Sequence, residues 1–488
     1  MLKKSTHGFL FNMQNKGRDF SWLNLPGVGR KTTLGLNTTT HSSLMTASRN
    51  ADLVIIGGGI SGTSLLFAAA RYSSIRRIVL IEKYPGLARV NTAATHNSQT
   101  LHCGDIETNY TLAKALTVQR AARLVVNYAT RLARDEPLLR RCSRMVLGVG
   151  AGECARLRRR HAEFAPHYPG LCLYEKADIG RLEPNVVYAH GEMRPEELVA
   201  CGAEGEYAAA DFAALASSFA NQARASGKDI ELRLGTRVAR IRANGESFDV
   251  LTDQGTITAG GVVVSAGGHS LFLAQQMGYG HEFSCLPVAG SFYFAREVLN
   301  GKVYTVQNDK LPFAAIHGDP DLLVPGKTRF GPTAVILPEL ERYHLRTIID
   351  FLRVVRFDTA LMQVLGDLFR DGDIRRYILK NLLFEVPVVR RHLFLKDARK
   401  IVPSLEARDL RFARRVGGLR PQLVDRRAKR LLMGEAKISP GNGLIFNMTP
   451  SPGATSCLDN AEQDLSNVTR HLGATFDSER FRAELENP

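Results

Sequence analysis

The hydrophobic pattern of the chain is most regular between residues 51 and 82. Four consecutive apolar residues, Leu53–Ile56, suit a strand that is buried on both faces of a sheet. An Ala- and Leu-rich segment, Thr63–Tyr72, predicts a helix, and the apolar run Ile78–Ile81 predicts a second strand. The pattern therefore predicts a strand–helix–strand unit of an α/β protein.

A second group of strands is predicted near residue 250. Apolar and polar residues over 247–258 flank a turn at 253–255, which predicts a hairpin. A buried strand follows over 261–268 and ends in a pair of glycines. Upstream of this group we expect helices over about 112–140, over most of 151–200 and over 208–225, with a short strand at 145–150.

The pattern changes after about Leu286. Strand-like and turn-rich segments come first, and long helical stretches follow them. We expect strands at 291–295 and 303–306, turns at 317–320 and 329–333, helices over 342–369 and 374–395, and a last helix near 461–472. This order predicts a second domain, built from a mixed sheet with helices.

Three glycines and one acid give the first unit its chemistry. Gly57, Gly59 and Gly62 fill the spacing Gly-x-Gly-x-x-Gly after the first strand, and Glu82 ends the second strand. The glycines permit a tight turn, close approach of a pyrophosphate, and close packing of helix on strand. The pyrophosphate would lie at the helix N-terminus, and Glu82 would bind both ribose hydroxyls. The pattern indicates FAD or NAD rather than NADP; a glycine-rich turn in another α/β unit is the alternative.

Two features favour FAD over NAD. The strand at 261–268 returns to the sheet long after the fingerprint, whereas an NAD domain of this type is usually contiguous. The segment Pro450–Thr455 precedes a helix whose N-terminal dipole would stabilise a reduced flavin, although an ordinary helix start is the alternative. We therefore expect an α/β fold with an FAD-binding, Rossmann-type (glutathione-reductase-like) sheet and a second, mixed α+β substrate domain.

Five segments of unusual composition carry a resemblance to a known family. They are NSQTLHCGDIETNYT (97–111), HGDPD (317–321), TRFGPTA (328–334), GGLRPQ (417–422) and GLIFNMTPSPGATSCL (443–458). Together they resemble the malate:quinone oxidoreductase family from about Asp52 to the helix after Cys457. The resemblance implies an FAD enzyme that oxidises (S)-malate to oxaloacetate and passes electrons to a membrane quinone. It also implies a peripheral membrane protein that works without NAD.

The implied chemistry assigns roles to five residues. A neutral histidine is suited to take the proton of the C2 hydroxyl near pH 7. We expect His317 to be this base, oriented by Asp319, with His102 as the other candidate. Malate is a dianion, so we expect Arg329 to bind a carboxylate in a bidentate manner. Arg420 is expected to face the flavin or the substrate, and a packed or surface-paired role is the alternative for each residue.

The cofactor residues follow from the fingerprint and the resemblance. Val238 would give backbone contacts to the adenine, and Lys83 would line the adenosine site or be solvated. The residues expected to hold FAD are Gly57, Gly58, Gly59, Ile60, Ser61, Gly62, Glu82, Lys83, Ser98, Gln99, Thr100, Val238, Gly267, Gly268, Gly418, Gly453, Ala454 and Thr455. No metal site is expected, because the seven cysteines form no C-x-x-C pair.

The composition adds a net charge of +16. A basic balance can attract nucleic acid, anionic lipid or anionic substrates. The arginine clusters lack interleaved aromatic residues, so we expect no nucleic-acid partner. The expected partners are malate, a membrane quinone and an anionic membrane surface, which segment 131–160 or 390–430 would contact. Solvated helix faces are the alternative reading of these clusters.

Residues 1–50 are rich in Ser, Thr and basic residues and poor in acids. This composition is typical of an organelle transit peptide and predicts a mitochondrial protein, peripheral on the inner membrane. A start at Met45 would remove that inference. The expected domains are an extension at 1–50, an FAD-binding domain at 51–285 with a helical insertion at about 112–205, a substrate domain at 286–415, a return to the FAD-binding domain at 416–475, and a tail at 476–488.

Other functions fit parts of the same sequence. A related FAD-dependent 2-hydroxyacid dehydrogenase, such as one for L-2-hydroxyglutarate, would need the same flavin site and similar carboxylate contacts. One methylene separates the two substrates, a difference of only about 1–3 kcal/mol in a pocket. An FAD-containing nucleic-acid protein and an oxidase that uses dioxygen are the remaining alternatives.

Overall fold

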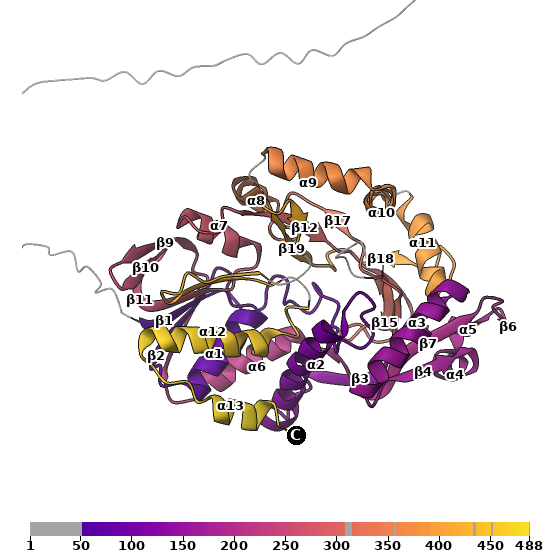
Figure 1. Cartoon of the computed structure of the whole chain (residues 1–488), viewed down its shortest axis with the longest axis horizontal. Coiled ribbons are helices and arrows are strands. Elements are labelled where there is room, and N and C mark those ends of the chain that lie inside the picture. The colour runs from indigo at the N-terminus through magenta and orange to yellow at the C-terminus, as the bar shows by residue number, and fades with distance from the viewer. Residues whose placement is uncertain are drawn as a thin grey trace, which may run out of the picture. The chain divides into compact units, whose positions relative to one another are not determined.

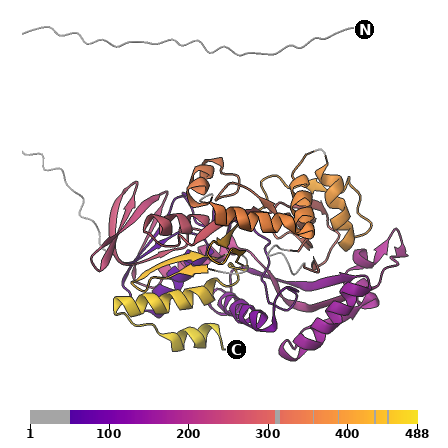
Figure 2. The same cartoon turned by 45° about the horizontal axis from the view of Figure 1, so that its top comes forward.

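The computed structural model describes residues 51–307, 315–355, 358–387, 389–432, 436–449 and 452–487. The predicted extension at 1–50 lies outside the described residues, as do Pro450 and Ser451 of the predicted flavin-facing segment. The described chain folds into one unit from residue 51 onward, with two large sheets and a smaller one (Figure 1; Figure 2).

The first sheet contains the predicted strand–helix–strand unit. Its strands follow the order β21-β22-β11-β1-β2-β8, and the β9–β10 hairpin pairs with β11. They span β1 (Ala51–Ile56), β2 (Arg77–Glu82), β8 (Asp229–Leu234), β9 (Val238–Asn244), β10 (Ser247–Thr252), β11 (Gly255–Val264), β21 (Ala436–Ile438) and β22 (Leu444–Met448). The five strands from β22 to β8 run parallel, so the predicted return of the chain to this sheet at residues 261–264 is confirmed.

Both faces of β1 are buried, as the apolar run predicted. Leu53 and Ile55 pack with the helices α1 (Ile60–Tyr72), α6 (Phe212–Arg224) and α12 (Cys457–Leu472). Val54 and Ile56 face the opposite layer, which contains residues of the β9–β10 hairpin and of α7 (Gly268–Gln276). Figure 1 shows α1, α6 and α12 gathered on one side of this sheet. The strand must therefore be apolar at every position.

The other sheets come from the middle of the chain. The larger has the order β18-β13-β16-β15-β14-β3-β7-β4, and the smaller has the order β17-β12-β19-β20. The strands of the larger are β3 (Leu139–Val149), β4 (Cys172–Glu175), β7 (Leu198–Ala210), β13 (Tyr293–Arg296), β14 (Lys302–Thr305), β15 (His317–Pro320), β16 (Lys327–Gly331) and β18 (Arg411–Phe412). The smaller contains β12 (Phe283–Ala289), β17 (Val335–Ile336), β19 (Leu419–Asp425) and β20 (Arg430–Leu431), and a separate pair joins β5 (Tyr188–Ala189) to β6 (Glu192–Met193).

The prediction of a helical insertion at about 112–205 is wrong in one respect, because this segment contains long strands as well as helices. Its helices are α2 (Leu112–Asn127) with a π-helical turn at Tyr128–Leu132, α3 (Ala151–Phe164), α4 (Lys176–Leu182) and α5 (Pro184–Val187). The segment also contributes β3, β4 and the start of β7, and β3 pairs in parallel with β14 of the expected substrate domain. Local composition favoured helix, whereas pairing with strands far along the chain determines the structure.

The two long helices predicted at 342–369 and 374–395 are also corrected. The structure has four shorter helices, α8 (Ile348–Val355), α9 (Thr359–Arg370), α10 (Gly372–Leu383) and α11 (Arg390–Ile401). The Asp358 side chain caps α9 and divides the first predicted stretch, the Asp371 side chain caps α10 between the two stretches, and the second stretch is divided where α10 ends and α11 begins. The expected tail forms α13 (Ser478–Leu485), and no helix among the described residues is long and apolar enough to cross a membrane.

Candidate active site

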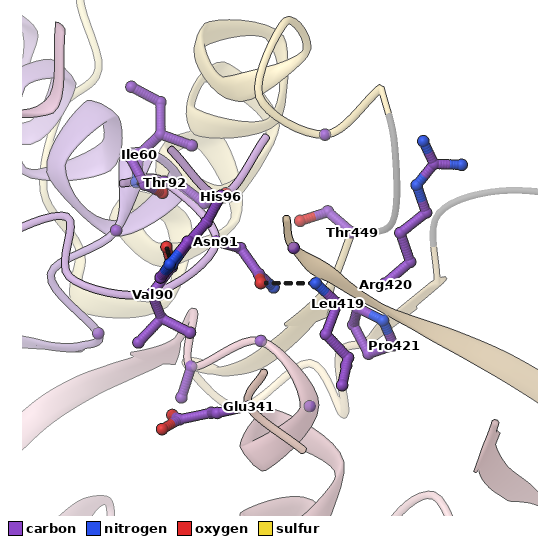
Figure 3. A pocket seen from close by; sticks show the side chains of 18 of the residues that line it. Ile60, Val90, Asn91, Thr92, His96, Glu341, Leu419, Arg420, Pro421 and Thr449 are labelled. Atoms are coloured by element: carbon purple, nitrogen blue, oxygen red, sulfur yellow. Dashed lines mark hydrogen bonds between the residues drawn. The ribbon is translucent and has the colours of Figure 1, made fainter. Parts of the chain in front are cut away.

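A large cleft crosses the molecule from the glycine loop after β1 to the start of β19. It encloses about 2020 Å³ of empty space, part of which is open to solvent. Figure 3 shows Ile60 and Thr92 on one side of this cleft and Arg420 on the other, with the Asn91 side chain accepting the Leu419 N–H between them. The residues that line the cleft include most of the predicted cofactor residues and two of the predicted reaction residues, His102 and Arg420.

The glycine loop forms the first part of the wall. A Cβ on Gly62 would lie 1.9 Å from the Gly57 carbonyl oxygen, so the turn closes only with glycine at this position. Helix α1 starts at Ile60 without an acidic residue in its first turn or a side-chain cap. Its N-terminal dipole therefore suits a bound anion, although the Ile60 N–H already donates to the Thr92 Oγ1, and Gly59 and Ser61 line the cleft beside it.

Glu82 lies beyond this loop, at the end of β2. Its carboxylate accepts the Gly58 N–H at 2.7 Å and the Tyr84 N–H at 2.9 Å. These two bonds hold the side chain in the cleft wall and leave it lone pairs for further donors. Burial raises the pKa of Glu82 against the opposing effect of these bonds. Lys83 also lines the cleft but pairs with Glu341 at 2.6 Å, so its predicted cofactor contact competes with an ion pair.

The opposite end of the cleft brings His102 beside the loop before α12. Its Nδ1 lies 2.6 Å from the Glu107 Oε1, and its backbone N–H donates to the Thr455 Oγ1 at 3.1 Å. The imidazole is 15% exposed and lines the cleft, as do Gly453 and Ala454. With Nδ1 held by the carboxylate, Nε2 is the ring nitrogen available to a molecule in the cleft.

Arg420 contributes a cation to the same end. It lines the cleft, and burial lowers its pKa. Among the described residues it has no ion-pair or hydrogen-bond partner, although the Tyr377 hydroxyl lies close enough to influence it. A partly buried guanidinium without a carboxylate partner is costly unless a ligand supplies the anion.

His317, Asp319 and Arg329 form a network behind the wall rather than in it. His317 Nδ1 lies 2.6 Å from one Asp319 oxygen, and the other oxygen accepts from Lys302 Nζ at 3.0 Å and Arg329 Nε at 3.3 Å. All four side chains are at most 2% exposed. Strand geometry explains the grouping, because Asp319 of β15 stands directly opposite Arg329 of β16.

This network gives Arg329 internal partners that compete with its expected substrate contact. Its guanidinium also donates to the Asn97 carbonyl at 3.2 Å and to the Ser98 carbonyl, and it lies 3.6 Å from Asp321. These internal contacts occupy its donors and favour a structural role for Arg329 over direct binding of a substrate carboxylate. His317 stacks on Tyr304 with 4.5 Å between ring centroids and is only 1% exposed, which argues against direct contact with substrate.

Several predicted cofactor residues support the wall without lining it. Gly58 holds Glu82, Gly62 packs α1 on the turn, and Thr455 accepts from His102. Gln99 is buried, and its side-chain amide donates to the Ala94 carbonyl and accepts the Leu322 N–H, so in this structure the side chain braces the loop. The remaining predicted residues lie in the wall: Gly57, Gly59, Ile60, Ser61, Glu82, Lys83, Ser98, Thr100, Val238, Gly267, Gly268, Gly418, Gly453 and Ala454.

The site contains residues that the sequence did not single out. Thr92 lines the cleft and accepts the Ile60 N–H at 3.0 Å. Lys302 and Tyr304 both contact Thr100 of the wall, at 3.3 Å and 2.7 Å, and so connect the buried network to the cleft. Glu107 lies in segment 97–111, which carries part of the family resemblance, and its position five residues after His102 could have indicated that the two side chains pair.

The donor set fits FAD. The glycine loop and the N-terminus of α1, which has no acidic residue in its first turn, suit a pyrophosphate, Glu82 suits a ribose, and the cleft continues past both to His102 and Arg420. Among the described residues no group of three or more His, Cys, Asp or Glu side chains could hold a metal ion.

Comparison with known proteins identifies the family. The model of the FAD dependent oxidoreductases matches residues 52–458. A probable malate:quinone oxidoreductase from Campylobacter jejuni is 46% identical over 441 residues, covering 89% of this chain and 98% of the relative. The chain belongs to the malate:quinone oxidoreductase family. A second family member, the malate:quinone oxidoreductase of Helicobacter pylori, is 42% identical and is covered over 98% of its length by 90% of this chain.

More distant proteins share the fold with this family member. An L-2-hydroxyglutarate dehydrogenase from Salmonella houtenae is 25% identical over 83% of this chain and 90% of its own. Glycine oxidase from Geobacillus kaustophilus aligns with a TM-score of 0.59 at 16% identity, over 87% of this chain and 95% of its own. L-α-glycerophosphate oxidase from Mycoplasma pneumoniae, solved with FAD bound, aligns with a TM-score of 0.58 at 17% identity, over 86% of this chain and 95% of its own. These structures share an FAD-binding α/β fold with mixed sheets.

Proposed function

We propose that this protein oxidises (S)-malate to oxaloacetate with FAD and reduces a membrane quinone. The observation that carries the proposal is the single cleft that joins a dinucleotide cradle at the glycine loop to a histidine and an arginine at its far end, and this arginine has no ion-pair partner in the part of the chain that the structure describes. The membership of the family supports the choice of malate. The 25% identity to L-2-hydroxyglutarate dehydrogenase makes that substrate the runner-up.

Arg420 is the residue that we propose for a malate carboxylate. The site offers its guanidinium no described anion, so a bound carboxylate would supply the missing partner with two charge-assisted hydrogen bonds. This role moves from Arg329, whose donors are taken by Asp319 and backbone carbonyls. A bound malate carboxylate would thus neutralise the charge of the partly buried Arg420 guanidinium.

His102 is the base that we propose, ahead of His317. Its imidazole reaches the cleft, and Glu107 fixes the ring so that Nε2 can take the proton of the malate C2 hydroxyl. As that proton leaves, the C2–O bond becomes a carbonyl and the C2 hydrogen departs with its electron pair. When bound, FAD supplies the two-electron acceptor for that hydrogen and the link to the quinone.

The proposal also includes the type of the FAD-binding sheet and the location of the enzyme in the cell. We assign the sheet to the glutathione-reductase-like type, which is supported by its parallel strand order and the attached β9–β10 hairpin. A quinone acceptor requires work at a membrane surface. The mitochondrial inner-membrane location rests on residues 1–50, which lie outside the described residues, and the named relatives are bacterial.

Two substitutions test the assignment of the base. We expect His102→Gln to retain yellow, FAD-bound protein and to slow flavin reduction by malate about 10²- to 10⁴-fold. The matched variant His317→Gln should keep most of this rate and lose stability. Anaerobic stopped-flow absorbance of the flavin measures both. Normal flavin reduction in His102→Gln would refute the base, whereas wild-type enzyme that reduces its flavin no faster with malate than with L-2-hydroxyglutarate would refute the substrate.

A further inference from the structure

Exposed apolar side chains gather on one part of the molecule. Eleven of the fifteen large hydrophobic residues that are exposed among the described residues lie between Leu345 and Leu393. This segment contains α8, α9, α10 and α11, which follow one another along one edge of the molecule (Figure 1). A concentration of this kind marks an interaction surface rather than the scattered exposure of an ordinary surface.

The exposed residues follow helical spacing. On α8 and the turn before it they are Leu345, Ile349 and Leu352, and around α10 they are Leu379, Leu382, Leu383 and Val386. Each set recurs at three- and four-residue steps, so each forms one stripe along its helix.

The inward face of α10 shows that its outer stripe is not needed for the core. Ile374 packs on Val288 and Ala334, and the Asn381 side chain accepts the Ala334 N–H at 2.8 Å. The helix is thus already anchored on one side, and its second apolar stripe faces outward.

The charge beside these stripes is basic. Arg346, Arg376 and Arg391 are exposed, and none has an ion-pair partner among the described residues. An apolar stripe with arginines beside it is the pattern of a helix that lies in the headgroup region of an anionic bilayer.

Some arginines of segment 131–160, one of the two segments expected to face a membrane, make internal or local contacts, while Arg134, Arg140 and Arg159 are exposed without an ion-pair partner among the described residues. Arg144 is buried and pairs with Asp105 at 2.8 Å, and Arg160 donates to four backbone carbonyls. Arg158 pairs with Glu175 and Glu197. No large hydrophobic side chain of segment 131–160 is exposed, so this segment has no apolar stripe to insert and is less suited to lipid than α8–α11.

The position of α10 links this surface to the cleft. Val288 and Ala334, on which α10 packs, both line the cleft. A bilayer at the outer stripe would therefore lie one helix away from the proposed reaction site. That arrangement suits an acceptor that is dissolved in lipid.

We propose that α8–α11 dock the enzyme on an anionic lipid bilayer, with the outer stripe of α10 inserted among the headgroups. The proposal rests on the proposed function for its choice of a lipid-soluble acceptor.

A matched pair of triple variants tests the docking surface. The docking variant is Leu379→Gln, Leu382→Gln and Val386→Gln, and the control is Met193→Gln, Leu323→Gln and Val324→Gln, which are exposed hydrophobic residues elsewhere. Co-sedimentation uses the full-length FAD-loaded enzyme with vesicles of phosphatidylcholine and phosphatidylglycerol. We expect vesicle binding of the docking variant to fall at least about tenfold. Its malate oxidation with a vesicle-embedded quinone should fall in parallel, while oxidation with a soluble dye is retained and the control is unaffected in all three assays.

The outcomes separate the two proposals. Equal vesicle binding by the docking variant and the control would overturn the docking surface. The proposal would also be overturned if the wild-type enzyme does not bind vesicles and is an oligomer in light scattering, while the docking variant is a monomer. That result would assign the face to self-association. The charge-reversal variant Arg376→Glu with Arg391→Glu is a second measurement, and unchanged binding to anionic vesicles would count against the proposal. Failure of the wild type to oxidise malate with any acceptor would refute the proposed function and leave the vesicle result standing.

Discussion

Replacing Asp319 by Asn removes the one negative charge that the buried network places between two cations. The carboxylate is fully buried and accepts from Lys302 at 3.0 Å and from Arg329 at 3.2 and 3.3 Å. Asn has nearly the same shape but leaves both cations without that charge. Removing one partner of a buried ion pair costs about 3–5 kcal/mol, so we expect a loss of this size in the free energy of unfolding at pH 7.

The pH dependence of this loss follows from two pKa shifts. Burial alone would raise the pKa of Asp319, but Arg329 and Lys302 outweigh it and hold the pKa far below its usual range. Its stabilisation is therefore fully present above about pH 4 and is lost as the pH falls further. Burial lowers the pKa of His317 to about 4 against the attraction of Asp319. The unfolded chain then binds more protons between about pH 4 and 6.5, so this histidine makes stability rise with pH in that window.

Urea unfolding of FAD-saturated enzyme, followed by circular dichroism from pH 3 to pH 8, measures these effects. The matched control is Asp367→Asn, which breaks the exposed pair between Asp367 and Arg370 on α9. Exposed pairs contribute only about 0–1 kcal/mol, so the control should change little. Equal losses in the two variants, or an Asp319→Asn effect that disappears already at pH 6, would refute the argument from burial.

Three further predictions concern the cleft. Arg420→Gln should raise the KM for malate roughly 10- to 100-fold without loss of FAD, because two charge-assisted hydrogen bonds disappear. Steady-state kinetics measures this, with Arg224→Gln at the exposed end of α6 as the control, and an unchanged KM would exclude Arg420 from substrate binding. Gly59→Val should give folded protein without flavin, since a Cβ at Gly59 meets only the Thr92 hydroxyl at 3.1 Å, whereas Gly62→Ala should fail to fold because its Cβ would overlap the Gly57 carbonyl. Circular dichroism measures folding, and absorbance at the flavin band measures bound FAD. Flavin retained in Gly59→Val would contradict the cofactor placement. Glu107→Leu should lower kcat by up to about 10²-fold with little change in KM, because His102 loses the contact that orients its ring; an equal loss in flavin content would instead indicate a structural role.

The sequence predicted the cofactor end of the molecule well. The run Leu53–Ile56, the glycines after it and the acid at Glu82 specified β1, the turn, α1 and β2. These elements interact within about 30 residues of chain, and a turn that excludes a Cβ at Gly62 leaves glycine as the only choice. Local steric constraints of this kind are visible in the sequence itself.

The sequence was less informative where partners lie far apart in the chain. The sequence predicted only a short strand at 145–150 and a helix up to about residue 140, but pairing with β7 and β14 on either side extends the strand over 139–149. The turn-rich reading of 317–320 and 329–333 was likewise overridden by pairing between β15 and β16. Strand formation depends on neighbours, and no local pattern supplies them.

The same contrast between what the sequence predicts and what the fold decides applies to single residues at the reaction end of the cleft. The motifs selected His102, His317, Arg329 and Arg420 as a set, because charge and imidazole chemistry are properties of the residue type. Only the tertiary structure could separate them. It gives Arg329 to Asp319 and two carbonyls, buries His317 behind the wall, and leaves His102 and Arg420 facing the cleft. Which polar group is paired internally and which remains available to a ligand is decided by contacts between distant segments, so it is a property of the folded chain alone.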